Sequence, residues 1–203
     1  RGFSTRFEAD LDMRMNQDKE VSAYHVINEY DELDLRALLL QYGELRNAPK
    51  LARAIVAARG EGEIKTSATL KEVLLPFLPK HKEYKVLAQI YQAIRIEVNQ
   101  EIEVLKEFLI QTVELLDVGG RIRLIYYHSL EDRLVKRFIR NGMFEGEPEK
   151  DLYGNVSVPY KKVGGLIIPT EDEIKTNNRA RSAKLRVAER IALDATHNKK
   201  KFK

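Results

Sequence analysis

Apolar residues recur at helical spacing through most of the first half of the chain. The stretches 31–43, 47–60 and 66–75 each combine this spacing with a glycine or proline at their end, so each is predicted to be a helix. Asp31, Asn47, and Thr66 or Ser67 are the candidate N-caps. Short capped helices of this kind predict a small all-α unit.

The longest apolar stripe runs from Glu83 to Asp117 and contains neither glycine nor proline. Its apolar positions repeat every three or four residues, which predicts either one long helix or two helices that meet near Val98-Asn99. The later half leads directly into Gly119-Gly120 and an apolar run. We therefore expect this half to cover a sheet, and the earlier half to belong with the preceding helices.

A buried strand followed by a basic helix is predicted over 119–140. The run 121–127 is largely apolar or aromatic, and the polar residues after it begin the helix. If this strand is parallel and central, its polar end lies where open sheets bind ligands. The alternative is a simple helix cap, in which Ser129 caps and the acids favour the helix start. The polar residues concerned are His128, Ser129, Glu131, Asp132 and Arg133.

The remaining segments are less regular. Residues 1–20 show no period but contain large apolar side chains, so we expect an irregular, anchored segment. Residues 141–162 read as a long loop, and 166–168 as a short strand. A capping-box pattern opens a brief helix at Thr170. Residues 183–191 alternate apolar and basic positions, which favours a terminal edge strand, with a short helix as the alternative.

Charge is distributed unevenly along the chain, whose net charge is only +4. The segments 119–140, 175–190 and 197–203 together carry a net +13, which leaves −9 on the rest. This separation indicates a surface that faces a polyanion, although the terminal lysines could equally be a solubilising tail.

Several functional classes are excluded by residue type. The chain contains no cysteine, which removes disulfides, thiolate catalysis and cysteine-ligated metals, and fits a reducing compartment. No apolar run approaches membrane-spanning length. The four histidines lie far apart in sequence, so we expect no metal site. Ser129 lacks the flanks of a nucleophile elbow, and no phosphate-binding glycine loop is present.

Five motifs together resemble one family, the MraW-type ribosomal RNA methyltransferases, in the order in which that family has them. They are DLDMRM (10–15), YGELRNAPKLARAI (42–55), QAIRIEVNQEIE (92–103), GGRIRLIYYHSLEDRLVKRF (119–138) and NNRARSAKLRVAERI (177–191). They span nearly the whole chain. Small departures occur at Ala9-Asp10, at Asn16 and at Asn177-Asn178, where the family has other residues, so these turns can differ.

The resemblance implies an S-adenosyl-L-methionine-dependent enzyme that methylates the N4 of a cytidine in the decoding region of 16S rRNA. It implies an α/β fold, the C-terminal part of a Rossmann-like class I methyltransferase sheet with an inserted all-α domain. Residues 25–95 would be the insert, and 1–24 with 96–203 would belong to the catalytic domain. The small ribosomal subunit is the implied partner, and the cytoplasm the implied location.

The family also has a strand, a glycine-containing loop and acidic residues that hold the cofactor, and none of these motifs is found in this chain. Because the chain begins Arg1-Gly2-Phe3, without a methionine, we expect it to be the C-terminal two-thirds of such an enzyme. The cofactor contacts would then precede Arg1, and the fragment alone would be inactive. An uncovered edge at strand 121–127 would favour a homodimer or the missing segment as its partner.

Candidate site residues follow from the needs of the reaction. Methylation of an exocyclic amine requires a base taken out of its stack, an aimed lone pair and a polar acceptor for the amine protons. Asp12, Arg14, His128, Ser129 and Asp132 are the candidates to line this pocket. Arg133, Lys136, Arg137, Arg179, Arg181 and Lys184 are the candidates to meet phosphates.

Structural interpretations remain open beside these roles. Asp12 with Arg14 could be an ion pair that only stabilises the fold, and Arg137 with Arg140 could form a solvated helix face. A non-catalytic RNA-binding or ribosome-assembly module, built from the helical unit and the basic segments, is the alternative function. S-adenosylmethionine binding by the full-length protein separates the two hypotheses, since a module of this kind would not bind the cofactor.

Overall fold

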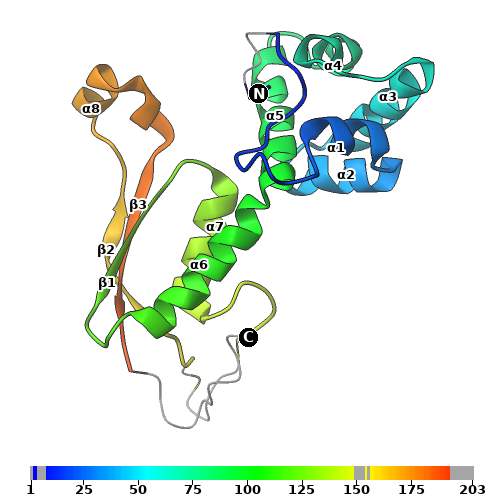
Figure 1. The fold of residues 1–203 in the computed structure, drawn as a ribbon. Coiled ribbons are helices and arrows are strands. Elements are labelled where there is room, and N and C mark those ends of the chain that lie inside the picture. Colours follow the sequence, from blue (N-terminus) through cyan, green and yellow to red (C-terminus); the bar gives the residue numbers. More distant parts are fainter. Residues whose placement is uncertain (1, 4–7, 149–153, 155, 193–203) are drawn as a thin grey trace. The chain divides into compact units, whose positions relative to one another are not determined.

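A computed structural model describes residues 2–3, 8–148, 154 and 156–192 (Figure 1). The chain forms two compact units, Arg1–Glu101 and Ile102–Lys203. The first unit is helical and the second contains a small antiparallel sheet, so the chain mixes both kinds of secondary structure. Each unit is described in turn.

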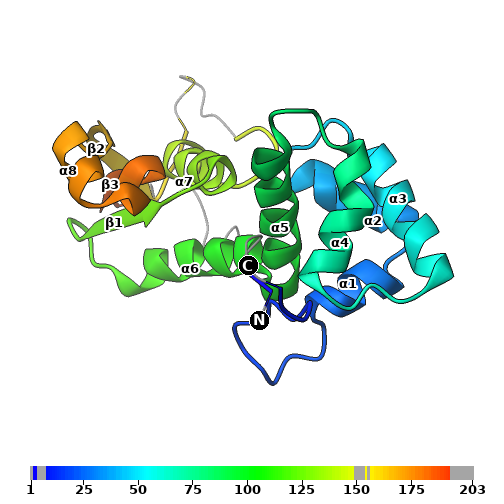
Figure 2. The same cartoon turned by 90° about the horizontal axis from the view of Figure 1, so that it is seen from above.

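The helices of the first unit share one hydrophobic core, to which its last and longest helix contributes (Figure 2). Its elements are α1 (Ala23–Glu29), α2 (Glu32–Gln41), α3 (Ala48–Glu61), α4 (Ser67–Leu74), the 3-10 helix Leu75–Phe77 and α5 (Glu83–Asn99). Leu35, Leu51, Ile55, Leu70 and Ile90 are fully buried in one shared core. The apolar stripes read from the sequence therefore form the interior of this unit.

The predicted helix starts are largely confirmed. The Asp31 side chain accepts a hydrogen bond from the Asp34 amide at 2.7 Å, and Thr66 accepts one from the Thr69 amide at 3.2 Å. Asn47 occupies the N-cap position of α3, but its side chain makes no capping bond. Helix α1 was not predicted. It begins at Ala23 after a capping box formed by Ser22 and the third helical residue, a signal that His25 disguises because glutamate or glutamine is usual there.

The apolar stripe from Glu83 to Asp117 forms two helices, which confirms the second of the two alternatives that the sequence left open. Helix α5 ends at Asn99, and α6 (Glu101–Leu115) begins two residues later. Gln100 between them has a left-handed backbone, with φ of 54°. A side chain in this region costs about 1 kcal/mol or more.

The N-terminal segment packs on the helical unit. Leu11 and Met13 are 2% and 0% exposed and belong to the same core as the helices. The expected anchoring of this segment is therefore confirmed for residues 8–20. The compact unit consequently includes residues that we expected to belong to a catalytic domain, and it ends at Glu101.

The second unit consists of a three-stranded sheet and its helices. Its elements after α6 are β1 (Arg121–Tyr126), α7 (Ser129–Asn141), β2 (Tyr160–Ile167), α8 (Glu171–Thr176), the 3-10 helix Asn178–Ser182 and β3 (Lys184–Arg190). The strand order is β1-β3-β2, and both pairings are antiparallel. Helix α8 is the predicted brief helix, and the Thr170 side chain caps it.

Two strand predictions need correction, and the condition set for strand 121–127 is not met in the described sheet. β1 pairs only with β3 among the strands described, and antiparallel to it, so it is neither parallel nor central in this sheet. β3 is the central strand and not an edge strand. β2 begins at Tyr160, inside the predicted loop, and continues through Gly164-Gly165. These pairings join positions far apart in sequence, and periodicity carries no information about them.

Helices α6 and α7 lie on the same face of the sheet (Figure 1). Leu109 of α6, Phe138 of α7, and Ile122, Tyr126 and Ala188 of the sheet form the core between them. Tyr160 is also buried there, and its hydroxyl donates to the Thr112 hydroxyl at 2.7 Å.

In β3 the basic side chains face the helices and the apolar side chains face away, although alternation in a strand usually places apolar side chains inward. Its partners in register place Lys184 beside the buried Tyr126, and Ala188 beside the buried Ile122. Lys184, Arg186 and Arg190 therefore share the face that α6 and α7 cover, while Leu185 and Val187 lie on the other face. The basic side chains of this strand consequently need partners inside the unit.

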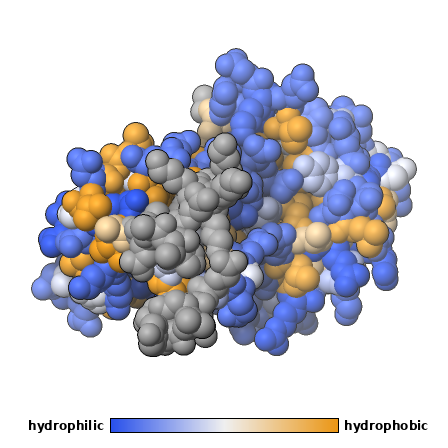
Figure 3. Space-filling view, turned by 90° about the horizontal axis from the view of Figure 1, so that it is seen from below, coloured by the Kyte–Doolittle hydropathy of each residue, from blue (hydrophilic) through white to orange (hydrophobic). Residues whose placement is uncertain are grey.

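No helix in the described part of the chain has the length and apolar character needed to cross a bilayer. On the face drawn in Figure 3, apolar side chains lie as separate patches among hydrophilic ones.

Candidate functional site

The predicted pocket residues fall into two groups, one in each compact unit. Asp12 and Arg14 lie in the irregular loop before α1. His128, Ser129 and Asp132 lie at the end of β1 and in the first turn of α7. The geometry of each group is given separately.

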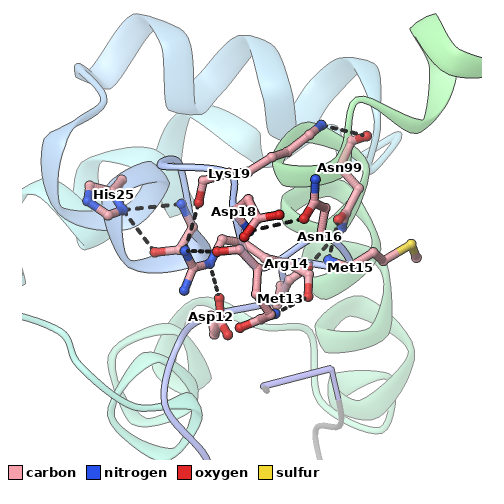
Figure 4. Close-up of polar contacts among 11 residues, drawn as sticks. Asp12, Met13, Arg14, Met15, Asn16, Asp18, Lys19, His25 and Asn99 are labelled. Atoms are coloured by element: carbon pink, nitrogen blue, oxygen red, sulfur yellow. Dashed lines mark hydrogen bonds and ion pairs between the residues drawn. The ribbon is translucent and has the colours of Figure 1, made fainter.

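Arg14 holds the N-terminal loop in shape (Figure 4). Its Nε donates to Asp12 Oδ1 at 2.5 Å, and its Nη1 donates to the carbonyl oxygens of Gln17 and Lys19 at 3.1 and 2.7 Å. Burial raises the pKa of the Asp12 carboxyl, but the hydrogen bond and charge of Arg14 outweigh it, so the net shift is downward. The pair is therefore ionised, and it closes the loop from 12 to 19.

Asn99 anchors the same loop to the last turn of α5. Its Nδ2 donates to the Met13 carbonyl at 2.8 Å and to the Arg95 carbonyl at 2.9 Å, and its Oδ1 accepts from the Met15 amide at 2.8 Å. Asn99 is 8% exposed, so these three bonds satisfy an amide that burial would otherwise penalise. Sequence reasoning missed this residue. Its signal was a polar side chain placed in the apolar stripe of a helix.

The start of α7 is a capping box. His128 is the N-cap, and Glu131 Oε2 accepts hydrogen bonds from the amides of Tyr127 and His128 at 3.0 and 3.2 Å. His128 Nε2 lies 3.2 Å from the same carboxylate. Ser129 is the first helical residue and not the cap that one interpretation gave it. The side chains of His128 and Glu131 thus stabilise the turn from β1 into α7.

Asp132 joins three elements. Its Oδ1 accepts from the Tyr126 hydroxyl at 2.8 Å and from Arg186 Nε and Nη2 at 3.0 and 2.8 Å, while Oδ2 accepts from Lys184 Nζ at 3.0 Å. The carboxylate therefore connects β1 and β3 to the first turn of α7. It is the partner that the inward-facing basic residues of β3 require.

These contacts keep Asp132 ionised. Burial alone would raise the pKa of its carboxyl, but the hydrogen bonds from Arg186, Lys184 and Tyr126 lower it to about 2. Burial and the carboxylate raise the pKa of the Tyr126 hydroxyl. At neutral pH Asp132 is thus a fully bonded anion, which makes it a poor acceptor for a proton in a reaction.

The candidates for phosphate contact are less uniform than the sequence suggested. Lys184 is bonded to Asp132, and Arg137 Nη2 donates to the Gly146 carbonyl. Lys136 is exposed on α7, and Arg179 and Arg181 are exposed on the 3-10 helix before β3. Lys184 therefore belongs to an ion pair inside the unit, whereas Lys136, Arg179 and Arg181 are exposed.

A cavity of about 350 Å³ lies between α7 and the strands β2 and β3. Its basic lining residues are Lys136, Arg140, Lys162 and Arg186, and its other lining residues are Ile139, Val158, Tyr160, Gly165 and Val187. Arg140, Lys162 and Arg186 were not predicted as site residues. Only the fold brings them together, because they come from three elements. No group of three or more potential metal ligands occurs within the described ranges.

The model of one known family, described as the MraW methylase family, matches residues 1–191. The chain belongs to this family. The resemblance found in the five motifs is thereby confirmed. The MraW methylase relatives include proteins named Ribosomal RNA small subunit methyltransferase H in several bacteria.

Those from Christiangramia forsetii and Flavobacterium johnsoniae are 69% and 66% identical to the chain over 191 residues. The one from Cytophaga hutchinsonii is 52% identical over 190 residues. Each comparison covers 94% of this chain. The chain spans 63% to 64% of the length of these relatives.

The acidic residues at the end of β1 are not free to bind the cofactor that a MraW methylase is expected to use. Adenosine binding in such a site needs a free carboxylate for the ribose hydroxyls, placed at a strand end. The carboxylates of Glu131 and Asp132 at the end of β1 are already bonded within the unit. We therefore assign no residue of this chain to the cofactor.

Proposed function

We propose that the protein is a methyltransferase that uses S-adenosyl-L-methionine to methylate the N4 of a cytidine in the decoding region of 16S rRNA. The observation on which this rests is the 69% identity, over 94% of the chain, to a protein named Ribosomal RNA small subunit methyltransferase H. The five motifs support the finer points of base, atom and region by resemblance. An rRNA substrate makes the small ribosomal subunit the partner and the cytoplasm the location.

The proposed fold is the C-terminal part of a Rossmann-like class I sheet with an inserted helical domain. An antiparallel strand in the centre of β1-β3-β2, with α6 and α7 on one face, agrees with an α/β methyltransferase. We propose 25–95 as the insert, and 1–24 with 96–203 as parts of the catalytic domain. The packing of Leu11 and Met13 on the helices supports a close association of the N-terminal loop with this insert.

In this proposal the predicted pocket residues act by positioning. Cytidine N4 must meet the methyl group in line, so small displacements of the surrounding backbone are costly. Arg14 fixes the loop from 12 to 19, and Asp132 fixes the start of α7 against β1 and β3. His128 and Ser129 lie in the turn that Asp132 and Glu131 hold. The proton acceptor for the amine is left without an assignment among these residues.

Methyl transfer to purified small subunits tests the proposal. The full-length protein is incubated with subunits and radiolabelled S-adenosylmethionine, and the modified nucleotide is mapped by mass spectrometry of nuclease fragments. We expect a single N4-methylated cytidine in the decoding region. Label at a different base or atom would contradict the substrate, and the absence of transfer would contradict the activity.

The 203-residue chain serves as the comparison. Because its carboxylates at the β1 end are bonded within the unit, we expect no saturable binding of S-adenosylmethionine in calorimetry and no transfer. Saturable binding by this chain would show that its own residues form the cofactor site.

A further inference from the structure

The cavity between α7 and β2 combines a cationic lining with an apolar wall. Among the described residues, four cationic side chains line it and no acidic one does. Its remaining lining is apolar apart from Tyr160, whose hydroxyl is bonded to Thr112, and Gly165. A volume of about 350 Å³ falls within the range of small-ligand sites and can hold one nucleotide.

Three of the cations are available to a ligand. Lys136, Arg140 and Lys162 have no acidic partner within the ranges that the structure describes; Arg140 Nε donates only to Asn141 Oδ1, at 3.0 Å. Lys136 and Arg140 are four residues apart on α7, so they lie on the same side of the helix. Arg186 is bonded to Asp132 and forms part of the wall.

We propose that this cavity binds one nucleotide of the RNA substrate, outside the reacting cytidine. Lys136, Arg140 and Lys162 contact its phosphates, and the base lies against Ile139 and Val158. The inference rests on the proposed function, because it takes RNA as the ligand. A site for free phosphate would need the cations but not the apolar wall, whereas a nucleotide uses both.

Two neighbouring lysines give a matched test. Successive residues of a strand face opposite sides of the sheet, so Lys162 lines the cavity and Lys161 lies on the other face, opposite Glu189. Both side chains are exposed. Acetylation of the full-length protein with and without 16S rRNA, read by mass spectrometry, compares them. We expect the reactivity of Lys162 to fall at least threefold with RNA and that of Lys161 to stay unchanged.

Binding of the same RNA over a range of salt concentrations supplies the second measurement. Lys162→Gln and Arg140→Gln should each weaken binding about three- to tenfold and reduce the slope of log affinity against log salt by about one, as expected for one lost phosphate contact. Lys161→Gln should match the wild type. Thermal unfolding of each variant confirms that the fold is intact.

The outcomes separate this inference from the proposed function. Equal protection of the two lysines, or equal binding by Lys162→Gln and Lys161→Gln, would overturn the nucleotide site while leaving methyl transfer untouched. Protection of Lys162 by inorganic phosphate to the same degree as by RNA, at matched ionic strength, would overturn it in favour of a small-anion site. Both readouts require only binding, so they remain valid if the enzyme fails to transfer a methyl group.

Discussion

Asp132 is the residue whose loss should disturb the sheet unit most. Asp132→Asn removes the charge that Arg186 and Lys184 share, and leaves two partly buried cations facing an amide. We expect the free energy of unfolding to fall by about 2 kcal/mol, measured in urea at pH 7. Asp172→Asn is the control, because Asp172 pairs with Lys175 on the surface and its loss should cost under about 0.5 kcal/mol.

The same carboxylate predicts a pH dependence. The fold lowers the pKa of Asp132 from 3.8 to about 2, so its contribution to stability is present above pH 4 and is lost as the pH falls towards 2. Solvent screening reduces this contribution to about 1–2 kcal/mol. The stability difference between wild type and Asp132→Asn should therefore shrink between pH 4 and pH 2. A constant difference over that interval would show that the pair is not coupled to titration.

Asn99 makes a prediction in the helical unit. Asn99→Ala removes three hydrogen bonds that hold the 12–19 loop, and leaves the Met13 carbonyl and the Met15 amide without these partners. We expect a loss of about 2–3 kcal/mol and faster hydrogen exchange at the Met15 amide. Asn16→Ala is the control, since the exposed Asn16 side chain accepts a hydrogen bond from the nearby Asp18 amide, within the same loop. If both variants exchange alike, Asn99 does not anchor the loop.

For single residues, the sequence predicted ion pairs between near neighbours but not pairs between residues far apart in the chain. Asp12 and Arg14 are two residues apart, so their pairing was a visible alternative. Asp132 and Arg186 are 54 residues apart, and no local pattern in either segment predicts that the two side chains pair. The residue types at the end of β1 were thus predicted, but the partners that decide their chemistry were not.

The break between α5 and α6 makes a prediction at the scale of elements. Gln100 has φ of 54°, which a β-branched residue tolerates poorly and glycine adopts freely. Gln100→Val should therefore unfold about 1–2 kcal/mol more easily than Gln100→Gly. Gln111→Val, on the exposed side of α6, measures the ordinary cost of valine in a helix, about 0.5 kcal/mol. A Gln100→Val variant as stable as Gln111→Val would contradict the left-handed backbone.

Helices and strands differed in how far the sequence predicted them. The helices follow from local spacing and from caps such as Asp31 and Thr66, which act within one turn. Strand β3 was located correctly, but its place in the sheet depends on β1 and β2, whose paired residues lie 18 or more positions away in the sequence. Its basic residues face inward, where apolar side chains are usual, because Asp132 pairs with two of them.

For the whole molecule, the first compact unit should fold without the second. Its core lies entirely within residues 11–98, and it includes Leu11 and Met13, which are almost fully buried. A fragment of residues 1–101 should unfold cooperatively, as followed by circular dichroism. A fragment of residues 25–95 lacks these two side chains and should be less stable by several kcal/mol. Equal stability of the two fragments would show that the N-terminal loop is dispensable.

The exposed edge of β1 has a consequence for how this chain behaves at high concentration. Among the strands that the structure describes, the outer edge of β1 has no partner, and with the exposed Ile125 and Tyr127 it can template pairing between copies, as edge strands do in protein aggregation. Arg123 acts as a gatekeeper on this strand, because bringing two such edges together juxtaposes like charges, whereas Arg121 is paired with Glu189 at 2.8 Å. Salt screens that repulsion, so concentrated stocks of the 203-residue chain should stay clear in dilute buffer and turn cloudy as sodium chloride is raised.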